Sequence, residues 1–373
     1  MRILHVVGGL DRGGAETWLV QVLRNIDRTK YKLDFLVHTE KPCAYDEEVK
    51  SLGSRIIPCL SPSKPAAYAF NFRRVLRTYG PYDCVHSHVH HFSGYVMTLA
   101  AMAGVSTRIV QSHTAHVEDK GTSIRKAYLR LSKGLVKNFA TKGIAVSELA
   151  GDSLFPIDWR GKDGWAVLPL GIDLAPFEQE VDGQALRTSL RIPKGAFVVG
   201  HVGRIVEAKN HKFFVQVAQA LSAIEPDAFF LLVGDGPLKP AIEESVRKAG
   251  VSDRFLFTGV RSDIPALMIG AMDVMLFPSL YEGLALILIE AQAAGLPSLI
   301  SDTIPHEADL IPGLIYREEL SNTPTQWARK LCSLSNRERL PNQVLNPAIR
   351  GYSIEESVKG LARIYSQQLG RTH

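Results

Sequence analysis

The chain begins with an apolar run at residues 3–7, ILHVV, that is followed at once by the glycine-rich residues 8–14, GGLDRGG. A short β-branched run that ends in glycine is typical of a buried strand and the turn after it. The run is too short for the apolar region of a signal peptide. We therefore predict a first strand at 3–7, a tight loop at 8–14 and a helix that begins near Glu16.

Runs of the same kind recur along the chain, and the spacing between them leaves room for a helix each time. This pattern is typical of parallel strands joined by crossover helices. It stops at residues 170–173, LGID, and restarts after a weakly structured stretch that ends near residue 183. The first series consists of 3–7, 33–37, 54–57, 84–87, 107–111, 143–146 and 165–169, and the second of 197–202, 229–233, 255–258, 274–277, 298–300 and 314–316.

The two series predict an α/β protein with two Rossmann-like, doubly wound domains that face each other across a cleft. We place the N-terminal domain at 1–175 and the C-terminal domain at 176–350. Residues 351–373 form a final helix, which either closes the second domain or crosses back to the first. Ligands of such sheets bind beyond the carboxyl ends of the strands, so we expect the site in the loops after the strands.

The composition excludes several classes of protein. With 46% hydrophobic and 22% charged residues and a mean hydropathy near zero, the chain is not disordered, collagen-like or a disulfide scaffold. Its apolar windows stay below the run of about 18 to 20 uncharged residues that spanning a bilayer requires. Its four cysteines lack C-x-x-C spacing, which argues against a disulfide framework or a cysteine zinc site. We expect a cytoplasmic protein without a nucleic-acid partner.

The net charge of +5 is concentrated in the first half of the chain. Residues 1–180 hold 23 Lys and Arg against 18 Asp and Glu, whereas residues 181–373 hold 20 of each. Within the first half, helical spacing over 123–142 places four cations on one side, at Lys126, Arg130, Lys133 and Lys137. Apolar residues centre on the opposite side, at Tyr128, Leu131, Leu135 and Phe139. The pattern fits a solvated face of a core-packed helix; the alternative is attraction to an anionic membrane surface or a lipid diphosphate.

The loop at 8–14 offers backbone amides at the start of a helix, where phosphate or another anion is favoured. It does not match the dinucleotide motif G-x-G-x-x-G, because position 10 is Leu and position 11 is Asp. This weakens a nicotinamide-cofactor site, although Glu40 follows the second strand where a ribose-binding carboxylate would stand. A tight strand-to-helix turn is an equally good interpretation of the loop.

In the second series, the strand at 197–202 is followed by Arg204 and then by Lys209. Two cations five residues apart at the end of a strand can converge on a diphosphate, Arg204 as a bidentate fork and Lys209 as a point charge. The alternative is a pair of solvated surface charges.

Residues 281–297, YEGLALILIEAQAAGLP, place Glu282 after a strand and Glu290 eight residues further on in an apolar helix. A carboxylate in such a helix needs partners, because its desolvation is costly. If the segment is helical throughout, the two carboxylates lie about 12 Å apart along the axis, which suits the two ends of one elongated ligand. The amides of Gly283, Leu284 and Ala285 would open that helix and meet a negative group between them.

His86, His88 and His90 alternate along a predicted strand and would share one face of it, as zinc ligands can. We expect no Cys or carboxylate to complete a metal site with them, so we interpret these residues as polar groups that line the cleft at the end of a strand. No Asp-x-Asp pair occurs in the chain. We therefore expect no metal ion and no cofactor, and cations and helix amides would meet the charge of a diphosphate.

Five motifs in this order resemble the family-4 retaining glycosyltransferases of GT-B fold. They are Gly-Gly-Ala-Glu at 13–16, Pro-x-Gly-Ile-Asp at 169–173, Gly-Arg-x4-Lys at 203–209, Gly-Asp-Gly-Pro at 234–237, and Glu-x7-Glu at 282–290 before Ala-x-Ala-x-Gly-Leu-Pro. The segment 300–305, ISDTIP, is similar to the bacterial exopolysaccharide and capsule branch of the family. The resemblance covers nearly the whole chain.

The resemblance implies the roles of the residues in the second domain. Arg204 and Lys209 would hold the nucleotide diphosphate, Glu290 the ribose hydroxyls and Glu282 the hydroxyls of the donor sugar. The backbone of residues 283–285 would lie against the sugar and the phosphates, and Val260 would lie near the base. The family commonly has Gly-Phe-Gly after the first Glu, whereas this chain has Gly283-Leu284-Ala285, in which Ala285 narrows the space beside the donor sugar.

In the first domain, Gly13 and Gly14 match the first-loop glycines of the family, which lie near the reacting centre. His113 matches the cleft histidine of the family at the end of a strand. The first domain would therefore serve the acceptor and the second the nucleotide sugar, and the two domains should close on the donor because site residues come from both.

By the same resemblance, the enzyme would move a sugar from a nucleotide diphosphate to a hydroxyl group with retention at the anomeric carbon. We expect a UDP-linked donor, with GDP as the main competitor. The acceptor would be a glycan or a sugar on a polyprenyl diphosphate in bacterial surface polysaccharide synthesis. The enzyme would work in the cytoplasm, with peripheral binding at the inner face of the membrane.

The motifs leave three other functions open. One is an epimerase of GT-B fold that acts on the nucleotide sugar itself, and another is an inactive subunit that binds a nucleotide sugar. The third is an NAD-type oxidoreductase with two Rossmann-like domains, against which the glycine spacing of the first loop argues.

Overall fold

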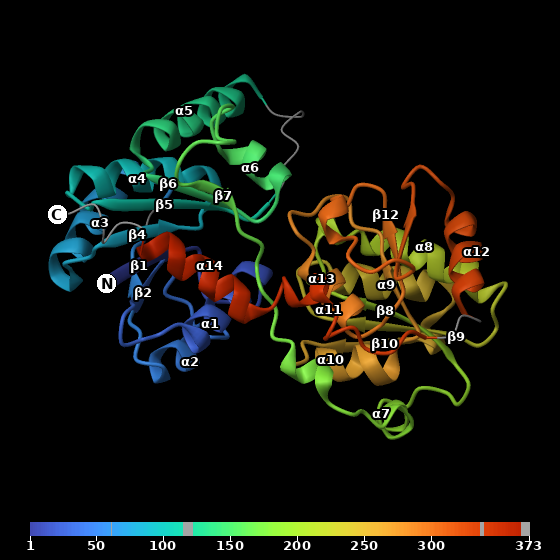
Figure 1. The fold of residues 1–373 in the computed structure, drawn as a ribbon. Helices are drawn as coiled ribbons and strands as arrows, with labels where there is room; N and C mark the ends of the chain where they lie inside the picture. Colours follow the sequence, from blue (N-terminus) through green and yellow to red (C-terminus); the bar gives the residue numbers. More distant parts are fainter. Residues whose placement is uncertain (61, 115–121, 336–338, 367–373) are drawn as a thin grey trace. The chain divides into compact units, whose positions relative to one another are not determined.

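The computed structural model describes residues 1–60, 62–114, 122–335 and 339–366 of the 373-residue chain. The chain divides into two compact units (Figure 1). Unit 1 consists of Met1–Gly171 and of the segment that begins at Ile354, and unit 2 consists of Ile172–Ser353. The chain leaves unit 1 within the LGID stretch, where the strand pattern of the sequence stops.

Unit 1 is built on a parallel sheet, and in the described residues its strands lie in the order β3-β2-β1-β4-β5-β6-β7. Side chains on both faces are mostly buried, as is usual for parallel sheets that helices cover on both sides. The winding reverses between β1 and β4, so the switch point of the sheet lies there. The strands are β1 (Arg2–Val7), β2 (Lys32–Val37), β3 (Ile56–Pro58), β4 (Cys84–Ser87), β5 (Thr107–Ser112), β6 (Lys142–Ala145) and β7 (Trp165–Val167).

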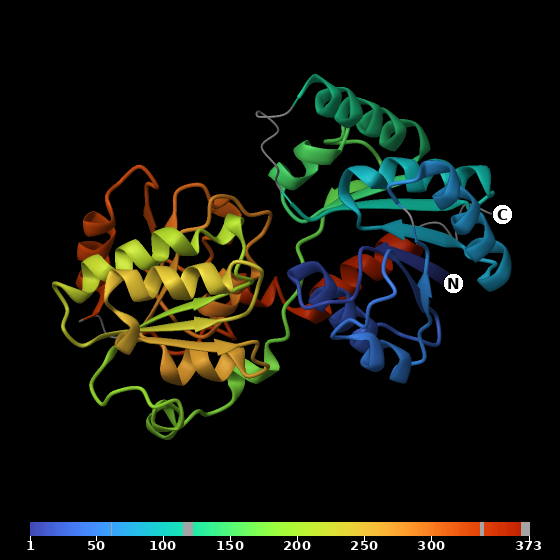
Figure 2. The ribbon, with the colours of Figure 1, turned by 180° about the vertical axis from the view of Figure 1, so that it is seen from behind.

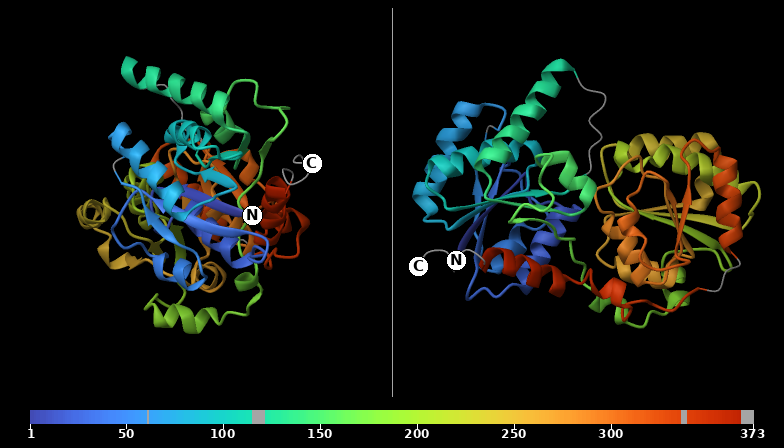
Figure 3. Two further views of the ribbon diagram at one scale, coloured as in Figure 1. Left: turned by 90° about the vertical axis from the view of Figure 1, so that its left-hand side faces the viewer. Right: turned by 45° about the horizontal axis from the view of Figure 1, so that its top comes forward.

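Helices cover both faces of this sheet. Leu4 and Val6 of β1 point to the face on which α3, α4 and α5 pack. On the other face, α1 and α14 lie side by side (Figures 1 and 3), and Trp18 Nε1 donates a hydrogen bond to Ser357 Oγ at 2.9 Å. The described helices are α1 (Gly14–Asn25), α2 (Asp46–Ser51), α3 (Pro65–Tyr79), η1 (His90–Phe92), α4 (Ser93–Met102), α5 (Ser123–Phe139), α6 (Glu148–Leu154) and α14 (Ile354–Ser366).

Unit 2 repeats this architecture. In the described residues its parallel sheet has the order β10-β9-β8-β11-β12-β13, and its switch point lies between β8 and β11. The strands are β8 (Phe197–Val202), β9 (Ala228–Val233), β10 (Phe255–Gly259), β11 (Val274–Phe277), β12 (Ser298–Ser301) and β13 (Ile315–Glu318).

One face of the second sheet is covered by α8, α9 and α12, which bury Phe214, Val246 and Trp327 against it. Figure 2 shows α8 and α9 side by side over the strands. The described helical segments of unit 2 are η2 (Ala175–Glu178), α7 (Gly183–Ser189), η3 (Glu207–Lys209), α8 (His211–Ser222), α9 (Lys239–Ala249), η4 (Ser252–Arg254), α10 (Ile264–Ala266), η5 (Leu267–Ala271), α11 (Leu286–Ala293), η6 (His306–Ala308), α12 (Pro324–Ser335) and α13 (Pro347–Arg350).

The predicted fold class, two doubly wound α/β domains, is confirmed. Every strand predicted from the sequence is present in the described residues, with its ends moved by at most two positions. The helix expected near Glu16 begins at Gly14. None of the described helices is both long enough and apolar enough to cross a membrane.

Two predictions about helices are wrong. The segment from Glu282 is not helical throughout, because α11 begins only at Leu286, so the axial separation of 12 Å between the two carboxylates does not apply. The expectation that the apolar side of α5 packs on the core is also wrong, because Tyr128 and Leu131 are exposed.

The reason for the different orientation of α5 is its close packing on α4. α5 buries Leu129, Ser132 and Val136 instead. A Cβ atom on Gly94 of α4 would lie 2.7 Å from the carbonyl oxygen of Ser132, so the backbones of the two helices approach closely at this point. Small residues at the helix contact therefore decide which side of α5 faces the core.

Candidate functional site

In unit 2, the loops after β8 and β11 leave the sheet at its switch point, where these two strands are hydrogen-bonded neighbours. A switch point leaves room for a ligand beyond the strands, because the chain departs in opposite directions from the two strands. The loop after β8 carries Arg204 and Lys209, and the loop after β11 carries Glu282. The Leu280 amide donates to the Ala208 carbonyl oxygen at 2.8 Å and ties the two loops together.

The structure pairs two of the predicted site residues directly. Lys209 Nζ lies 2.6 Å from Glu282 Oε1, and the side chains keep only 19% and 14% of their surface exposed. The ammonium group also lies 4.7 Å from the centre of the Phe277 ring, a cation–π contact. The pair joins the ends of β8 and β11 and holds both side chains in fixed positions before any ligand arrives.

Arg204 lies on the same loop as Lys209 but differs from it in exposure and in pairing. Its side chain is exposed and makes no ion pair with another residue in the described part of the chain. The loop around it is held by backbone packing: a Cβ on Gly234 would lie 2.0 Å from the carbonyl oxygen of Gly203, and Gly234 has a φ of +136°. This close approach explains why glycine begins the Gly-Asp-Gly-Pro motif.

The segment between Glu282 and α11 is an irregular loop whose residues 283–285 are buried. Leu284 and Ala285 are 9% and 3% exposed, and Ala285 caps α11, whose first turn begins at Leu286. The amino end of α11 thus lies four residues after Glu282, and although the Leu286 amide donates to the Leu284 carbonyl oxygen at 2.9 Å, the positive end of the helix dipole favours a negative group there. Of the predicted residues 283–285, the structure places all three in this loop.

Glu290 lies in the middle of α11 with a half-buried side chain, among apolar neighbours. The loss of hydration around its carboxyl group raises the pKa of Glu290 to about 7. The described residues offer this carboxyl no ion-pair partner. Within the described part of the chain, no side-chain hydrogen bond or ion pair satisfies this carboxyl, and a ligand with hydroxyl donors could do so.

Val260 lies apart from this group. It follows Gly259, the last residue of β10, and is 52% exposed. β10 is the edge strand of the sheet, with β9 between it and β8. The structure thus places Val260 at the same carboxyl edge of the sheet as the switch point, two strands away from it.

In unit 1, the loop after β1 ends with Gly13 and Gly14 at the amino end of α1. Gly13 is the N-cap residue, and a Cβ there would lie 2.3 Å from Glu16 Oε2. A Cβ on Gly14 would meet open space. Because the Glu16 carboxylate is the end of a flexible side chain, it could move away from a Cβ on Gly13, and Gly14 is the position where a larger side chain would extend out of the loop.

His113 directly follows β5, and its Nε2 lies 2.9 Å from Nδ1 of His88. Nε2 of His88 in turn lies 2.9 Å from Nδ1 of His5, in the middle of β1. Burial lowers the pKa of His113 and of His5 to about 3, so both rings are neutral at ordinary pH. His113 and His88 were predicted from the sequence as polar residues at strand ends, whereas His5 was not, because it resembles a core residue of an apolar strand.

The predicted alternation of His86, His88 and His90 on one strand is wrong, because β4 ends at Ser87 and His90 lies in η1 with a φ of +47°. His5 takes the third place instead. In the described residues, His5, His86 and His88 each bring a potential ligand atom within 4.8 Å of the others. In the sequence, the signal for this arrangement was a histidine in the first predicted strand. The pairing of His5 in register with His86 is seen in the structure.

The four cations of α5 are spread along an exposed surface. Lys126, Arg130 and Lys137 are exposed, whereas Lys133 is half-buried and its Nζ lies 3.1 Å from the carbonyl oxygen of Asp152. Lys133 and Lys137 also line a hollow of about 660 Å³ with Arg160 and apolar residues of the segment after α6. The cations therefore share their surface with apolar groups and are not confined to a purely polar face.

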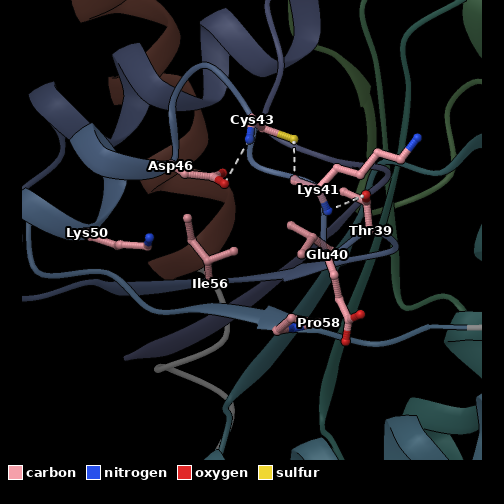
Figure 4. A pocket seen from close by; sticks show the side chains of 9 residues that line it. Thr39, Glu40, Lys41, Cys43, Asp46, Lys50, Ile56 and Pro58 are labelled. Atoms are coloured by element: carbon pink, nitrogen blue, oxygen red, sulfur yellow. Dashed lines mark hydrogen bonds between the residues drawn. The ribbon is translucent and has the colours of Figure 1, made fainter.

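A smaller hollow of about 170 Å³ lies beyond the ends of β2 and β3 (Figure 4). Figure 4 shows Glu40 and Lys41 on its rim pointing in different directions, with Asp46 accepting from the Cys43 amide at 2.9 Å. Apart from Glu40, it contains none of the residues that the sequence analysis selected.

Family models match both units of the chain. Residues 12–175 match the model described as "Glycosyltransferase Family 4", and residues 196–337 match the model described as "Glycosyl transferases group 1". The first match spans Gly13, Gly14 and His113, and the second spans Arg204, Lys209, Glu282 and Glu290.

Two curated relatives extend this result. The chain is 34% identical to EpsF of Bacillus subtilis (strain 168), which is named as a glycosyltransferase, over 100% of this chain and 98% of EpsF. It is 30% identical to the UDP-Gal:alpha-D-GlcNAc-diphosphoundecaprenol alpha-1,3-galactosyltransferase of Escherichia coli, over 59% of this chain and 58% of that protein.

Among solved structures, the chain is similar to HepE of Anabaena in complex with UDP and glucose, with a TM-score of 0.79. The identity is 19%, and the match covers 98% of this chain and 100% of HepE. At this level of identity the likeness concerns the fold.

Proposed function

Because the chain belongs to the family-4 glycosyltransferases of GT-B fold, we propose that it transfers a sugar from a nucleotide diphosphate to a hydroxyl group, with retention at the anomeric carbon. The process it serves is bacterial polysaccharide synthesis. The observation that carries the proposal is the group of charges at the switch point of unit 2, where Lys209 is paired with Glu282 and Arg204 stands exposed on the same loop.

In this reaction the bond between the anomeric carbon and the diphosphate oxygen breaks, and a bond from the acceptor oxygen to the same carbon forms. The acceptor hydroxyl attacks from the face that the diphosphate leaves, and its proton passes to the departing phosphate oxygen. No protein nucleophile is needed. Negative charge grows on the leaving diphosphate, and preorganised positive groups stabilise it most at that moment.

Arg204 and Lys209 supply that positive charge, together with the amides at the start of α11. Lys209 is held by Glu282 at 2.6 Å, so it loses little conformational freedom when the diphosphate arrives. Arg204 is exposed and is available for a bidentate contact with phosphate. Since the sequence has no Asp-x-Asp pair, we propose that these groups take the place of a divalent ion, and we expect turnover to persist in EDTA.

The carboxylates have separate roles in this proposal. Glu282 accepts hydrogen bonds from the donor sugar while it orients Lys209, and Glu290 accepts two hydrogen bonds from the ribose hydroxyls. The raised pKa of Glu290 supports its role, because two donated hydrogen bonds would stabilise the ionised form that burial now disfavours. Val260 would lie beside the base.

Unit 1 would bind the acceptor and complete the reacting centre through Gly13, Gly14 and His113. The open space beside Gly14 and the neutral ring of His113 support this assignment. A neutral imidazole can donate and accept a hydrogen bond without placing a further cation beside the leaving group.

We propose UDP as the nucleotide of the donor. The support comes from relatives: HepE of Anabaena is crystallised with UDP and glucose and with UDP-glucose, and the name of the Escherichia coli relative gives UDP-Gal as its donor. The same name gives a sugar on a diphosphoundecaprenol as acceptor, so we propose a lipid-linked glycan as the acceptor of this chain.

A thermal-shift panel tests the donor. A ligand that binds only the native state raises the melting temperature, by an amount that grows with its affinity. We expect UDP-sugars to raise the melting temperature more than GDP-sugars, and the Lys209→Ala variant to lose part of this shift. A larger shift with any GDP-sugar than with every UDP-sugar would contradict the assignment of UDP.

NMR of the products separates transfer from epimerisation. We expect the UDP-sugar that binds best to be consumed only when an acceptor is present. The new glycosidic linkage should have the same anomeric configuration as the donor. If the free nucleotide sugar is epimerised without acceptor, the chain is an epimerase of the same fold. If neither change occurs with any lipid-linked acceptor, the chain is a binding subunit.

A further inference from the structure

The face of the unit 1 sheet beneath α1 and α14 carries a row of histidines. His5 of β1 and His86 of β4 lie side by side in register, and His88 and His113 follow at the carboxyl ends of β4 and β5. Trp18 of α1 packs edge-on against both His88 and His113, at 6.4 and 6.2 Å between ring centres. Burying four imidazole rings in one layer costs more free energy than burying apolar side chains, so a functional reason for them is expected.

Two hydrogen bonds link three of these rings into a chain. His5 Nδ1 lies 2.9 Å from His88 Nε2, and His88 Nδ1 lies 2.9 Å from His113 Nε2. His5 and His88 are also stacked, with 5.2 Å between ring centres. His88 therefore uses both of its nitrogens within the chain. The two end atoms, His5 Nε2 and His113 Nδ1, are buried and have no partner among the described residues.

All three rings are neutral. Burial lowers the pKa of His88 well below its ordinary value, and the neighbouring His86, His113 and His5 lower it further. A neutral imidazole has one N–H donor and one lone pair. His88 must therefore donate in one of its two hydrogen bonds and accept in the other.

This requirement ties the three tautomers together. If His88 carries its proton on Nδ1, it donates to His113 Nε2 and accepts from His5 Nδ1, so all three rings carry Nδ1–H. If His88 carries its proton on Nε2, it donates to His5 and accepts from His113, so all three rings carry Nε2–H. A mixture of the two tautomers would leave a buried hydrogen bond without a proton or with two protons.

We propose that His88 and His5 are positioning residues that couple the tautomer of His113 to their own, so that the three rings change tautomer only together. The proposal rests on the proposed function in one respect, namely that His113 acts at the reacting centre. In one of the two shared states His113 Nδ1 offers a sugar hydroxyl a donor and in the other an acceptor, whereas an isolated ring would take up its tautomer independently of His5 and His88.

A metal ion is the competing occupant of this layer. His5, His86 and His88 each bring a potential ligand atom within 4.8 Å of the others, and neutral imidazole is the form that ligates Zn²⁺. A bound ion would take lone pairs from His5 and His88 and would break the hydrogen bond between them. In addition, His86 Nδ1 already lies 2.9 Å from the Tyr365 hydroxyl. The hydrogen-bond chain uses the observed distances without any movement.

The first experiment uses the full chain labelled with ¹⁵N-histidine, at pH 7 and without nucleotide. Long-range ¹H–¹⁵N correlation spectra distinguish the Nδ1–H, Nε2–H and doubly protonated forms of each ring. We expect His5, His88 and His113 to give the same neutral tautomer. Different tautomers for His5 and His113, or a doubly protonated His88, would overturn the proposal. Metal analysis of the same sample, before and after added Zn²⁺, would also overturn it if one bound ion per chain shifts the His5 and His88 signals.

The second experiment removes the link. In His88→Phe we expect the tautomer of His113 to become independent of that of His5, and kcat to fall about tenfold with little change in the KM for the donor, as expected for the loss of one hydrogen bond. His88→Gln keeps one donor and one acceptor and should restore part of kcat. Tautomer populations of His5 and His113 that stay equal in His88→Phe would overturn the proposal.

His38→Phe is the matched control. His38 lies in the same unit, is half-buried, and forms a 2.9 Å hydrogen bond to the Tyr68 hydroxyl outside the chain of rings. We expect this variant to change stability but not the tautomer of His113. Since the spectra require no turnover, they test the coupling of the rings even if the transfer reaction itself proves to be assigned wrongly, and kinetics alone would test the latter.

Discussion

The two units differ in the groups that they place at the switch point of the same fold: charged side chains in unit 2 and neutral polar side chains in unit 1. At the β8/β11 switch point of unit 2, a lysine, a glutamate and an arginine carry full charges and remain partly accessible. At the β1/β4 switch point of unit 1, the corresponding polar groups are histidines that burial keeps neutral. The doubly wound topology thus determines where a site can form, whereas the residues at the strand ends determine its chemistry.

The difference has a physical reason. A charged ligand such as a diphosphate is bound well by charges that are already held in place and have not lost all contact with water, since complete burial of unpaired charge is very costly. A hydroxyl acceptor needs directional hydrogen bonds, and a dry, neutral environment gives them the most definite geometry. The following predictions test this contrast, beginning with the largest expected effect.

The role of the charged group in unit 2 is tested by Lys209→Ala. The variant removes one positive charge from the proposed diphosphate site and leaves Glu282 without its partner at 2.6 Å. We expect kcat to fall by roughly 10²- to 10³-fold, as for the loss of one preorganised electrostatic contact, with a much smaller change in donor Kd. Kinetics and calorimetry with the best UDP-sugar measure the two quantities.

Lys212→Ala is the matched control for this change, because Lys212 is an exposed lysine three positions further along the chain, in α8. We expect its activity to equal that of the wild type. Arg204→Ala should resemble Lys209→Ala in direction. Equal and small effects of Lys209→Ala on turnover and binding would show that the pair has no role in the transition state.

The scaffold beneath the charged site is tested by Gly234→Ala. The new Cβ would lie 2.0 Å from the Gly203 carbonyl oxygen at a φ of +136°, so the loops after β8 and β9 must separate. We expect the free energy of unfolding to fall by about 3 kcal/mol, measured by denaturant titration. Gly250→Ala has a positive φ of 71° but no atom within 4 Å, and it should cost only about 1 kcal/mol. Equal costs in the two variants would contradict the close approach.

The two units should also respond to pH in opposite directions. The pKa of His5 falls from about 6.5 in the unfolded chain to about 3 in the folded one, so its contribution to stability is complete above pH 6.5 and is lost as the pH falls toward 3. For each pH unit in this range, we expect the free energy of unfolding of His5→Phe to fall by about 1.4 kcal/mol less than that of the wild type. Urea titrations at several pH values measure the slope, and parallel slopes would contradict the neutral state of the ring.

Glu290 should give the reverse dependence. Its pKa rises from about 4.5 in the unfolded chain to about 7 in the folded one, so its contribution is complete below pH 4.5 and stability is lost as the pH rises toward 7. We expect Glu290→Gln to gain stability relative to the wild type over this range, by on the order of 2 kcal/mol at pH 7. The same urea titrations measure it, and a gain that does not depend on pH would exclude titration of this carboxyl as the cause.

The smallest effect is expected at the surface of α5. We propose weak docking on anionic membranes through Lys126, Arg130, Lys133 and Lys137, helped by the exposed Tyr128 and Leu131. Each cation near an anionic surface contributes on the order of 1 kcal/mol at most, and salt screens this within about 8 Å. Changing the four cations to Gln should lower the fraction that sediments with anionic vesicles at low salt.

A matched control changes Arg73, Arg74 and Arg77 of α3, which are exposed cations of the same unit, to Gln. We expect this variant to sediment like the wild type. If both variants lose binding equally, the attraction is a property of net charge and α5 is only a solvated helix. If the wild type ignores anionic vesicles at low salt, the acceptor is not met at a membrane surface.

Local patterns in the sequence were sufficient to predict the strands and most of the charged site. Short β-branched runs that end in glycine or polar residues predicted the strands of both units, because a strand buried on both faces is apolar along nearly its whole length. Arg204 and Lys209 were found because both stand on one short loop. Such features depend only on neighbours along the chain.

The tertiary structure alone decided which distant residues meet. Lys209 and Glu282 are 73 positions apart, and His5 and His88 are 83 apart, so their contacts depend on the order of strands in the sheets. The buried side of α5 was decided by the close approach of Gly94 to Ser132, which no helical periodicity contains. The sequence by itself determined the elements and their chemistry. Which of these residues contact one another was decided by the tertiary structure, because crossover connections bring together strand ends that are far apart along the chain.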